Sequence, residues 1–418
     1  MTKSLNTEKS RTNSSLFKWS RTHESPKYMS LRDFTEKAEN YLLSIINGNK
    51  LGFGPSLIKS NLFVLSKVFR SIVKSRHFLY DKRIFRDRTL GCLVVSIGNL
   101  TTGGTGKTPV TEIFARTLCA KGRRVAILSR GYRSKSKPLK TKILDKFRGK
   151  KTVSPPRIVS EGKNEVLLGP HMAGDEPYML ACNVPEAIVL TDPDRVKSGR
   201  FAIRNYQADT LLMDDGFQQL RLKPRINILL IDSTNPFSNH FLLPRGLLRE
   251  PIKNMRRAHF IFLTKANGGN HLRHLKKFIR KHNTKAEIIE CTHRPKYLKS
   301  LINQNQSLLS VLKGKKIAAI SAIAVPQSFE DFLIGFGAEI VYKERYADHH
   351  MYYQDEVETF VKNSESAGAE LIVTTEKDAV RFPEIKNPSI DITYLRVEID
   401  ILSGEESFNE CISRICFS

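Results

Sequence analysis

The segment from residue 98 to residue 108 holds the residue types that bind nucleotide phosphates. It reads Gly-Asn-Leu-Thr-Thr-Gly-Gly-Thr-Gly-Lys-Thr and follows an apolar run at residues 93–97. Glycines let backbone N–H groups converge on phosphate oxygens, and a helix that starts at the lysine adds its dipole. Lys107 is expected to reach the β and γ phosphates, and the Thr108 hydroxyl to ligate Mg²⁺. The sequence therefore predicts a P-loop for ATP, lined by Thr101, Thr102, Gly103, Gly104, Thr105, Gly106, Lys107 and Thr108.

Two positions distinguish this loop from other P-loop classes. The general pattern has glycine where this chain has Thr101, and partition-type ATPases carry a lysine where it has Thr102. A guanine-reading Asn-Lys-x-Asp string is matched only loosely, at residues 263–267. A tight glycine turn without a ligand is the structural alternative, and the flanking strand and helix patterns disfavour it.

Two adjacent carboxylates, Asp214 and Asp215, follow a second apolar run at residues 210–213. Acids that handle Mg²⁺ in P-loop enzymes lie at such strand ends, because carboxylate oxygens suit the ion and the sheet directs them toward the phosphates. A turn in which an aspartate caps the next helix is the alternative. We expect both residues to serve Mg²⁺.

Four shorter motifs are ambiguous when each is taken alone. Asp175, in the Gly-Asp-Glu-Pro string at 174–177, has the position of an ordinary helix N-cap. Arg249, in the proline-bounded string at 242–251, could stabilise transferring phosphoryl charge or form a surface ion pair. The Asp-His-His string at 348–350 resembles an acid–base or metal site, although paired histidines are often structural. The Thr-Glu-Lys-Asp string at 375–378 could simply cap a helix.

The motifs are separated by short, unbroken apolar runs that are rich in β-branched residues. Such runs form parallel strands buried on both faces of a sheet. The predicted strands cover residues 93–97, 125–128, 187–190, 210–213, 226–231, 260–263, 317–320 and 371–373. The predicted fold class is therefore α/β, with a P-loop NTPase-type parallel sheet, an N-terminal amphipathic helix and a smaller C-terminal α/β domain. Polar stretches at 135–165 and 294–315 are predicted to be loops.

The charge of the chain favours anionic partners. Its 418 residues carry a net charge of +26, and the pI is near 9.8. Nucleic acid, anionic lipid headgroups and phosphorylated substrates all fit this charge. No run reaches the roughly 20 apolar residues of a membrane-spanning helix. Residues 56–74 combine helical apolar spacing with Lys and Arg, which predicts either a helix lying on a membrane surface or one packed on its own domain.

Taken in order, the motifs resemble those of the tetraacyldisaccharide 4'-kinase family. The matching segments are 97–109, 128–132, 174–177, 214–218, 242–251, 348–350 and 375–378. Threonine at position 101 is usual in that family. Three positions depart from its pattern: Gln219 stands where histidine is usual, Arg245 where a small residue is common, and Leu247 where proline is usual.

The resemblance implies an enzyme that moves the γ-phosphoryl group of ATP, with Mg²⁺, onto the 4' hydroxyl of a tetraacyldisaccharide 1-phosphate. This substrate is a lipid A precursor, and the product of the reaction would be lipid IVA. The catalytic residues implied are Asp175 as general base, His349 as its partner in a dyad, Lys107 and Arg249. The metal ligands implied are Thr108, Asp214, Asp215 and Glu250. The enzyme would lie peripherally on the cytoplasmic face of the bacterial inner membrane, contacting anionic lipid and no nucleic acid.

Four parts of the chain are expected. They are a disordered basic extension (1–50), an amphipathic membrane-associating segment (51–90), a P-loop kinase core (91–310) and a C-terminal α/β domain (311–418). Two other functions stay open. A P-loop ATPase of a nucleic-acid or partition type would suit the charge but calls for aromatic residues on a basic face. A catalytically silent membrane-binding relative would keep the fold alone. The sequence predicts no oligomeric state.

Overall fold

The computed structural model describes residues 41, 44–46, 50, 52–131, 154–348, 350–385 and 388–417. The extension predicted for residues 1–50 therefore lies almost wholly outside the described residues. The same holds for most of the loop predicted at 135–165 and for His349.

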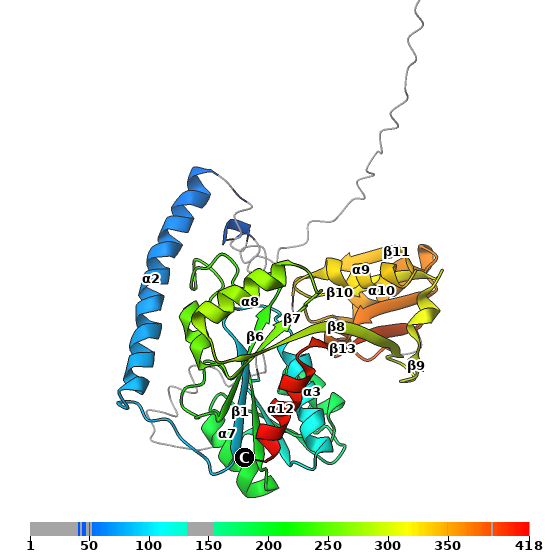
Figure 1. Ribbon diagram of the computed structural model, residues 1–418. Helices are drawn as coiled ribbons and strands as arrows, with labels where there is room; N and C mark the ends of the chain where they lie inside the picture. Colours follow the sequence, from blue (N-terminus) through cyan, green and yellow to red (C-terminus); the bar gives the residue numbers. More distant parts are fainter. Residues whose placement is uncertain are drawn as a thin grey trace, which may run out of the picture.

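One sheet of thirteen strands runs through the described part of the chain (Figure 1). Its order is β11-β10-β12-β13-β8-β7-β6-β1-β5-β2-β4-β3, with β9 paired to β8. Around the P-loop the strands are β1 (Leu93–Asn99), β2 (Val125–Ser129), β3 (Arg157–Glu161), β4 (Ile188–Thr191), β5 (Thr210–Asp214), β6 (Ile226–Asp232) and β7 (Phe260–Thr264). Strand β1 lies between β5 and β6, parallel to both. The loops that follow these three strands therefore meet at one edge of the sheet.

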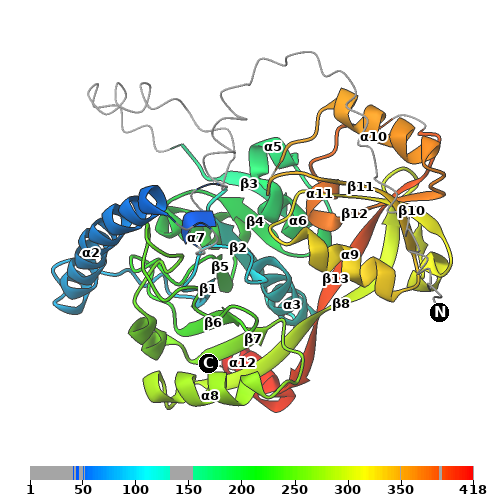
Figure 2. The same cartoon turned by 90° about the horizontal axis from the view of Figure 1, so that it is seen from above.

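The sheet confirms the predicted α/β class, because each of the eight predicted apolar runs forms a strand. Alternate residues of β1 enter different cores. Val95 and Ile97 pack with Phe114 of helix α3 (Lys107–Ala120), whereas Val94 packs on the opposite face with Val196 of α7 (Arg195–Tyr206). Helices cover both faces, as Figure 2 shows for α3 and α7. Burial on both faces explains why these strands are apolar without interruption.

A long two-stranded ribbon connects the P-loop part of the sheet to a second group of strands. Strand β8 (Glu287–Ser300) is parallel to β7 at its start and antiparallel to β13 (Ile392–Ser403) along its length. The loop predicted at 294–315 is thus wrong over its first part, since β8 continues to Ser300. Polar side chains are tolerated there because one face of the ribbon is solvated. Likewise, β3 occupies part of the stretch predicted as a loop at 135–165.

Beyond the ribbon lie three parallel strands and their helices. The strands are β10 (Lys316–Ser321), β11 (Glu339–Arg345) and β12 (Leu371–Thr375), with the short β9 (Gln306–Ser307) on β8; the helices are α9 (Pro326–Gly335), α10 (Gln354–Ser366) and α11 (Glu376–Ala379). The last helix, α12 (Glu405–Cys416), returns to the P-loop core, where Phe408 contacts the rings of Phe114 and Phe262. The division into domains at residue 310 stays a prediction.

The helix predicted near residues 56–74 is longer than expected and lies along one flank of the molecule. Helix α2 (Phe53–Asp81) stands apart from the other helices in Figure 1. Its inner face is fixed by Ser66, whose hydroxyl donates to the Leu242 carbonyl at 2.9 Å, and by Phe69, which packs into a core cluster. The other helices are α5 (Pro170–Ala173), α6 (Asp175–Asn183) and α8 (His271–His282), with 3₁₀ turns at Ile252–Arg257 and Leu309–Leu312. Of the helices described, α2 included, none has the length and apolarity needed to cross a membrane.

Candidate active site

The P-loop has the strand–turn–helix geometry that its sequence predicts. Strand β1 ends at Asn99, and α3 begins at Lys107 after Gly106, whose φ of 77° is left-handed. The Asn99 amide donates to the Thr105 hydroxyl at 2.8 Å, and the Thr264 hydroxyl donates to the Thr105 carbonyl at 3.0 Å. A Cβ at Gly106 would lie 2.8 Å from the ring of His293, so the loop packs tightly against this side chain. These contacts fix the loop backbone before the N-terminus of α3, where backbone N–H groups can bind phosphate.

The two acids come to the P-loop because the turn after β5 crosses Gly98 closely. A Cβ on Gly98 would lie 2.7 Å from the backbone nitrogen of Phe217, and Gly216 donates its N–H to the Ile97 carbonyl at 2.9 Å. Asp215 has φ of 52°, the left-handed conformation that aspartate tolerates better than most residues. The turn therefore directs Asp214 and Asp215 toward α3.

Asp214 and Asp215 are held in different electrostatic states. Asp214 is 1% exposed; it accepts from the hydroxyls of Ser129 at 3.3 Å and Thr111 at 3.5 Å. Burial raises the pKa of Asp214 to about 7, and the nearby Glu176 and Asp215 carboxylates add to the effect. Burial also opposes ionisation of Asp215, but Lys107 and Arg249 lower its pKa below the ordinary value.

These two carboxylates fit a hard cation. Weak hydrogen bonds leave the buried Asp214 poorly compensated, and a nearby positive charge would favour its ionised form. In the described part of the chain no three His, Cys, Asp or Glu side chains gather as a metal cluster. Mg²⁺ does not need one, because it usually takes one or two carboxylates together with water and substrate phosphates.

The motif at 242–251 is fastened to the start of the P-loop. Thr102 donates its backbone N–H to the Leu247 carbonyl at 2.8 Å, and Arg249 donates its N–H to the Leu100 carbonyl at 2.7 Å. This pairing brings the Arg249 guanidinium to Asp215, with both carboxylate oxygens 2.7 Å from Nη1. Lys107 Nζ lies 3.7 Å from the same carboxylate. Arg249 and Lys107 thus flank Asp215 at the point where phosphates are expected.

Glu250 makes its described contacts with other side chains, and its predicted metal role stays a prediction. Its Oε2 accepts from Arg257 at 2.6 Å and from Asn254 at 2.8 Å, and it lies 3.2 Å from His77 Nε2 of helix α2. Its pKa is lowered by His77 and Arg257 despite burial. An anion already surrounded by donors is a poor ligand for a further cation. Through these contacts Glu250 connects α2 to the loop that carries Arg249.

Asp175, the predicted general base, lies at the start of helix α6. Arg381, which follows α11, donates from Nε to Asp175 Oδ2 at 2.7 Å and from Nη1 to Asp378 Oδ1 at 3.1 Å. Arg381 and Asp378 have no exposed side-chain surface. Helix α6 packs against α3, the helix that follows the P-loop, and the Glu176 carboxylate contributes to the raised pKa of Asp214. Arg381 therefore joins the motifs at 174–177 and 375–378.

The motif at 348–350 also reaches this region. Lys377 Nζ lies 3.4 Å from Asp348 Oδ1, so the strings at 348–350 and 375–378 are in contact. His350 pairs with Glu356 at 2.9 Å and stacks on Tyr346, which gives it a structural role. His349, the predicted partner of Asp175, lies outside the described residues, and its role stays a prediction.

Two buried arginines of the site were missed from the sequence. Arg381 bridges Asp175 and Asp378, and Arg195 donates to the Asp192 carbonyl at 2.6 Å and the Asp214 carbonyl at 3.2 Å. An isolated arginine has no periodic signature. For Arg195 one signal existed: the string Thr-Asp-Pro-Asp-Arg at 191–195 is a polar turn directly after an apolar strand.

Comparison with known proteins agrees with this arrangement. The family described as tetraacyldisaccharide-1-P 4'-kinase matches residues 58–416. The chain belongs to this family. The tetraacyldisaccharide 4'-kinase of Syntrophus aciditrophicus is 38% identical over 365 residues, covering 84% of this chain and 91% of that protein. The corresponding protein of Halothermothrix orenii is 32% identical over 382 residues, covering 88% and 95%.

A solved structure shares the fold. The crystal structure of LpxK from Aquifex aeolicus in complex with ATP superposes with a TM-score of 0.66 at 27% identity, covering 86% of this chain and all of that one. The family resemblance drawn from the ordered motifs is thereby confirmed, together with the kinase class and the P-loop fold. The partition-type and nucleic-acid-type alternatives are set aside.

Proposed function

We propose that this kinase transfers the γ-phosphoryl group of ATP to the 4' hydroxyl of a tetraacyldisaccharide 1-phosphate, giving lipid IVA at the cytoplasmic face of the inner membrane. The observation that carries the proposal is the convergence of Lys107, Arg249 and the paired aspartates at the P-loop, with Asp175 held by Arg381 at the start of α6. Transfer to a hydroxyl needs a base, and Asp175 is the carboxylate to which the family resemblance gives this role.

Lys107 and Arg249 supply positive charge to the phosphates. In phosphoryl transfer most of the acceleration comes from positioning and from stabilising charge on the phosphoryl oxygens. Both cations now contact Asp215, so phosphate binding would exchange one anionic partner for another at little desolvation cost. Thr108, Asp214 and Asp215 would hold Mg²⁺, which when bound neutralises charge on the transferring group. Glu250 is left out of this set because its carboxylate is already surrounded by donors.

Asp175 would accept the proton of the attacking 4' hydroxyl. The guanidinium of Arg381 favours the ionised form of Asp175, which is the form a base requires, and fixes the carboxylate through Oδ2. His349 would be its dyad partner. This part of the proposal rests on the contact of Asp175 with the buried Arg381 and on its place in the first turn of α6, which packs against α3.

Helix α2 supports a peripheral membrane location. Its outer face exposes apolar side chains at helical spacing: Leu57, Val64, Leu65, Val68 and Ile72 are between 53% and 61% exposed. Exposed apolar surface of this kind marks an interaction site, and the lysines and arginines of the same helix suit anionic headgroups. A lipid substrate has to be reached at such a surface.

The test is phosphate transfer from labelled ATP to a tetraacyldisaccharide 1-phosphate in detergent micelles, with wild type, Lys107→Ala and Asp175→Ala. Lipid-dependent product that both variants lose by at least 100-fold supports the proposal. No product from a wild type that binds ATP would overturn it. If only Asp175→Ala kept its activity, the assignment of Asp175 as general base would be wrong, and the kinase activity itself would still be supported.

Membrane contact is tested separately by co-sedimentation with phospholipid vesicles. Val68→Glu on the exposed face of α2 is expected to reduce the bound fraction, whereas Ser366→Glu on the exposed face of α10 should leave it unchanged. Equal binding by both variants would contradict the role given to α2.

A further inference from the structure

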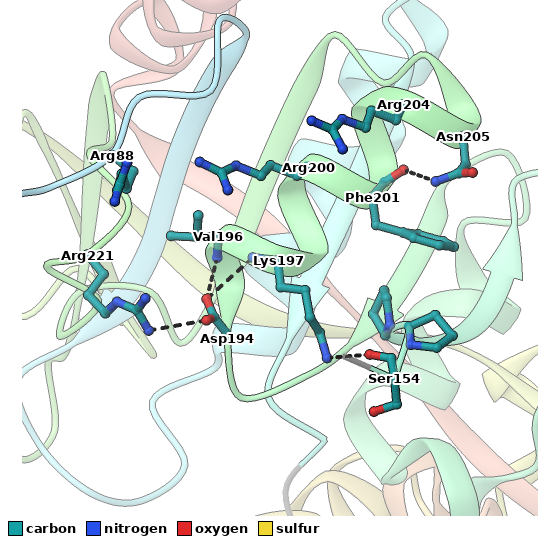
Figure 3. A pocket seen from close by; sticks show the side chains of 12 residues that line it. Arg88, Ser154, Asp194, Val196, Lys197, Arg200, Phe201, Arg204, Asn205 and Arg221 are labelled. Carbon is teal, nitrogen blue, oxygen red and sulfur yellow. Dashed lines mark hydrogen bonds and ion pairs between the residues drawn. The ribbon is translucent and has the colours of Figure 1, made fainter. Parts of the chain in front are cut away.

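A basic cavity lies on the α7 side of the sheet, apart from the residues assigned to catalysis. Its volume is about 530 Å³. Five cationic side chains line it, and Asp194 is the single acid: the cations are Arg88, Lys197, Arg200, Arg204 and Arg221. Figure 3 shows that they come from α7, from the segment before β1 and from the turn after β5.

Only part of this positive charge is compensated. Arg221 pairs with Asp194 at 3.2 Å, and Lys197 pairs with Asp192 and donates to the Ser154 carbonyl at 2.9 Å. Asp194 is also occupied as the N-cap of α7, accepting from the backbone of Val196 and Lys197. In Figure 3 the other three arginines, 88, 200 and 204, make no marked side-chain contact, and none of the side chains described elsewhere in the chain pairs with them.

Arg88, Arg200 and Arg204 are exposed to solvent, but they line a concave site. Arg200 and Arg204 are one helical turn apart on α7, so their charges repel, and Arg88 is added from another segment. The wall beside them is apolar, formed by Phe201, Pro155 and Pro156. Guanidinium groups that converge on a concave site bind phosphate well because each offers several N–H donors in a fixed plane.

The neighbouring segment indicates where the phosphate comes from. Ile84 and Phe85, which follow α2 and precede Arg88 by four and three residues, are 63% and 48% exposed. They lie in the chain between α2 and Arg88, which lines the cavity. If apolar side chains enter a bilayer interface, cations a few residues away lie at the depth of the headgroups.

We propose that this cavity binds the phosphate of an anionic phospholipid headgroup at the membrane surface. The inference rests on the proposed membrane contact of α2. It adds a specific headgroup site to a general apolar contact, and it assigns Arg88, Arg200 and Arg204 to that site.

The experiment compares vesicle binding by the full chain with and without its unpaired arginines. The probe is phosphatidylcholine vesicles prepared with or without phosphatidylglycerol at one fixed ionic strength. The variant Arg200→Gln/Arg204→Gln is matched by Arg273→Gln/Lys277→Gln, which removes two exposed cations at the same spacing from α8. We expect the cavity variant to lose roughly 10-fold to 30-fold in affinity for phosphatidylglycerol vesicles, since each cation near an anionic surface contributes about fivefold.

Three outcomes would overturn the proposal. One is wild-type affinity of the cavity variant for anionic vesicles; another is an equal loss in the α8 control, which would indicate net charge alone. The third is calorimetric binding of inorganic phosphate that the cavity variant abolishes while vesicle binding stays intact, which would assign the cavity to a soluble anion. If Val68→Glu fails to affect either vesicle type, the membrane contact of α2 is wrong, whereas a defect confined to the cavity variant would still support the headgroup site.

One further arm separates the headgroup from the substrate. In neutral detergent micelles without phospholipid, the KM of the cavity variant for the tetraacyldisaccharide 1-phosphate is expected to equal that of wild type. A KM raised tenfold there would assign the cavity to the substrate's own phosphate and refute the headgroup assignment.

Discussion

Replacing Arg381 by methionine is expected to destabilise the protein strongly, because its fully buried guanidinium connects the buried Asp378 to the largely buried Asp175. It lies 2.7 Å from Asp175 and 3.1 Å from Asp378, and neither Arg381 nor Asp378 exposes any side-chain surface. Methionine keeps much of the apolar stem and removes the charge. Breaking a buried ion pair from one side costs about 3–5 kcal/mol, since an uncompensated charge is left inside.

The Asp378 carboxylate, which stays buried in the variant, makes the expected loss of stability depend on pH. Burial already raises the pKa of Asp378, and Arg381 is among the groups that oppose this rise. Without Arg381 the pKa rises further, so the folded state favours a protonated Asp378. The loss of stability should then be largest near pH 8 and smaller near pH 5, because low pH supplies the proton that the buried carboxyl needs.

The assay is urea denaturation of wild type, Arg381→Met and Arg381→Met/Asp378→Asn, with Arg273→Met as a control for an exposed arginine of α8. The double variant should recover part of the loss, since asparagine needs no counter-charge. The control should change the unfolding free energy by less than about 0.5 kcal/mol. A loss below about 1 kcal/mol in Arg381→Met, or one that does not vary with pH, would refute the reasoning.

Three other results follow from close contacts in the structure. Gly98→Ala should lower the free energy of unfolding by about 1–3 kcal/mol, because its Cβ would lie 2.7 Å from the Phe217 backbone. Gly335→Ala in helix α9 should be neutral or slightly stabilising, because its Cβ would have no atom within 4 Å. Similar denaturation midpoints for the two variants would contradict this prediction. Burial and Lys265 lower the pKa of His293 to about 4, so the free energy of unfolding should fall by at most about 3 kcal/mol as the pH drops from 6.5 to 4. In His293→Gln this dependence of the unfolding free energy on pH should be weaker. An unchanged pH dependence in the variant would exclude His293 as its source. Ser66→Ala should cost about 1 kcal/mol, measured by thermal unfolding, because it removes one of the two donors to the Leu242 carbonyl and leaves only the Gly246 N–H; no change would mean that this contact does not fasten α2.

The sequence predicted best what depends on short, contiguous patterns. Strands buried on both faces are apolar throughout, so β1, β5 and β6 could be recognised and their carboxyl ends expected to meet. Strand β13 was missed although Val397, Ile399 and Ile401 alternate with charged residues in it. That alternation is typical of an antiparallel strand with one solvated face. The strands predicted from the sequence were unbroken apolar runs, a pattern that β13 does not have.

The site was predictable where a residue belongs to a motif and not where long-range packing decides its partners. The P-loop and the Asp-Asp pair were both found, because each directly follows a strand. Arg381 could not be found, since nothing in its local sequence indicates that Asp175, 206 residues away, lies against it. Glu250 adjoins a motif arginine, yet its direction depends on His77 and Arg257, which no local pattern specifies.

Helix α12 has a consequence for the biosynthesis of the enzyme. Phe408, Cys411, Ile412 and Ile415 belong to the same buried cluster as Phe114 of the P-loop helix. The nucleotide-binding core therefore lacks part of its interior until α12 has left the ribosome, and until then the nascent protein carries an exposed apolar face on that core. Chaperone capture of nascent chains, or premature termination near residue 400, should accordingly affect ATP binding even though every P-loop residue has been translated for some time.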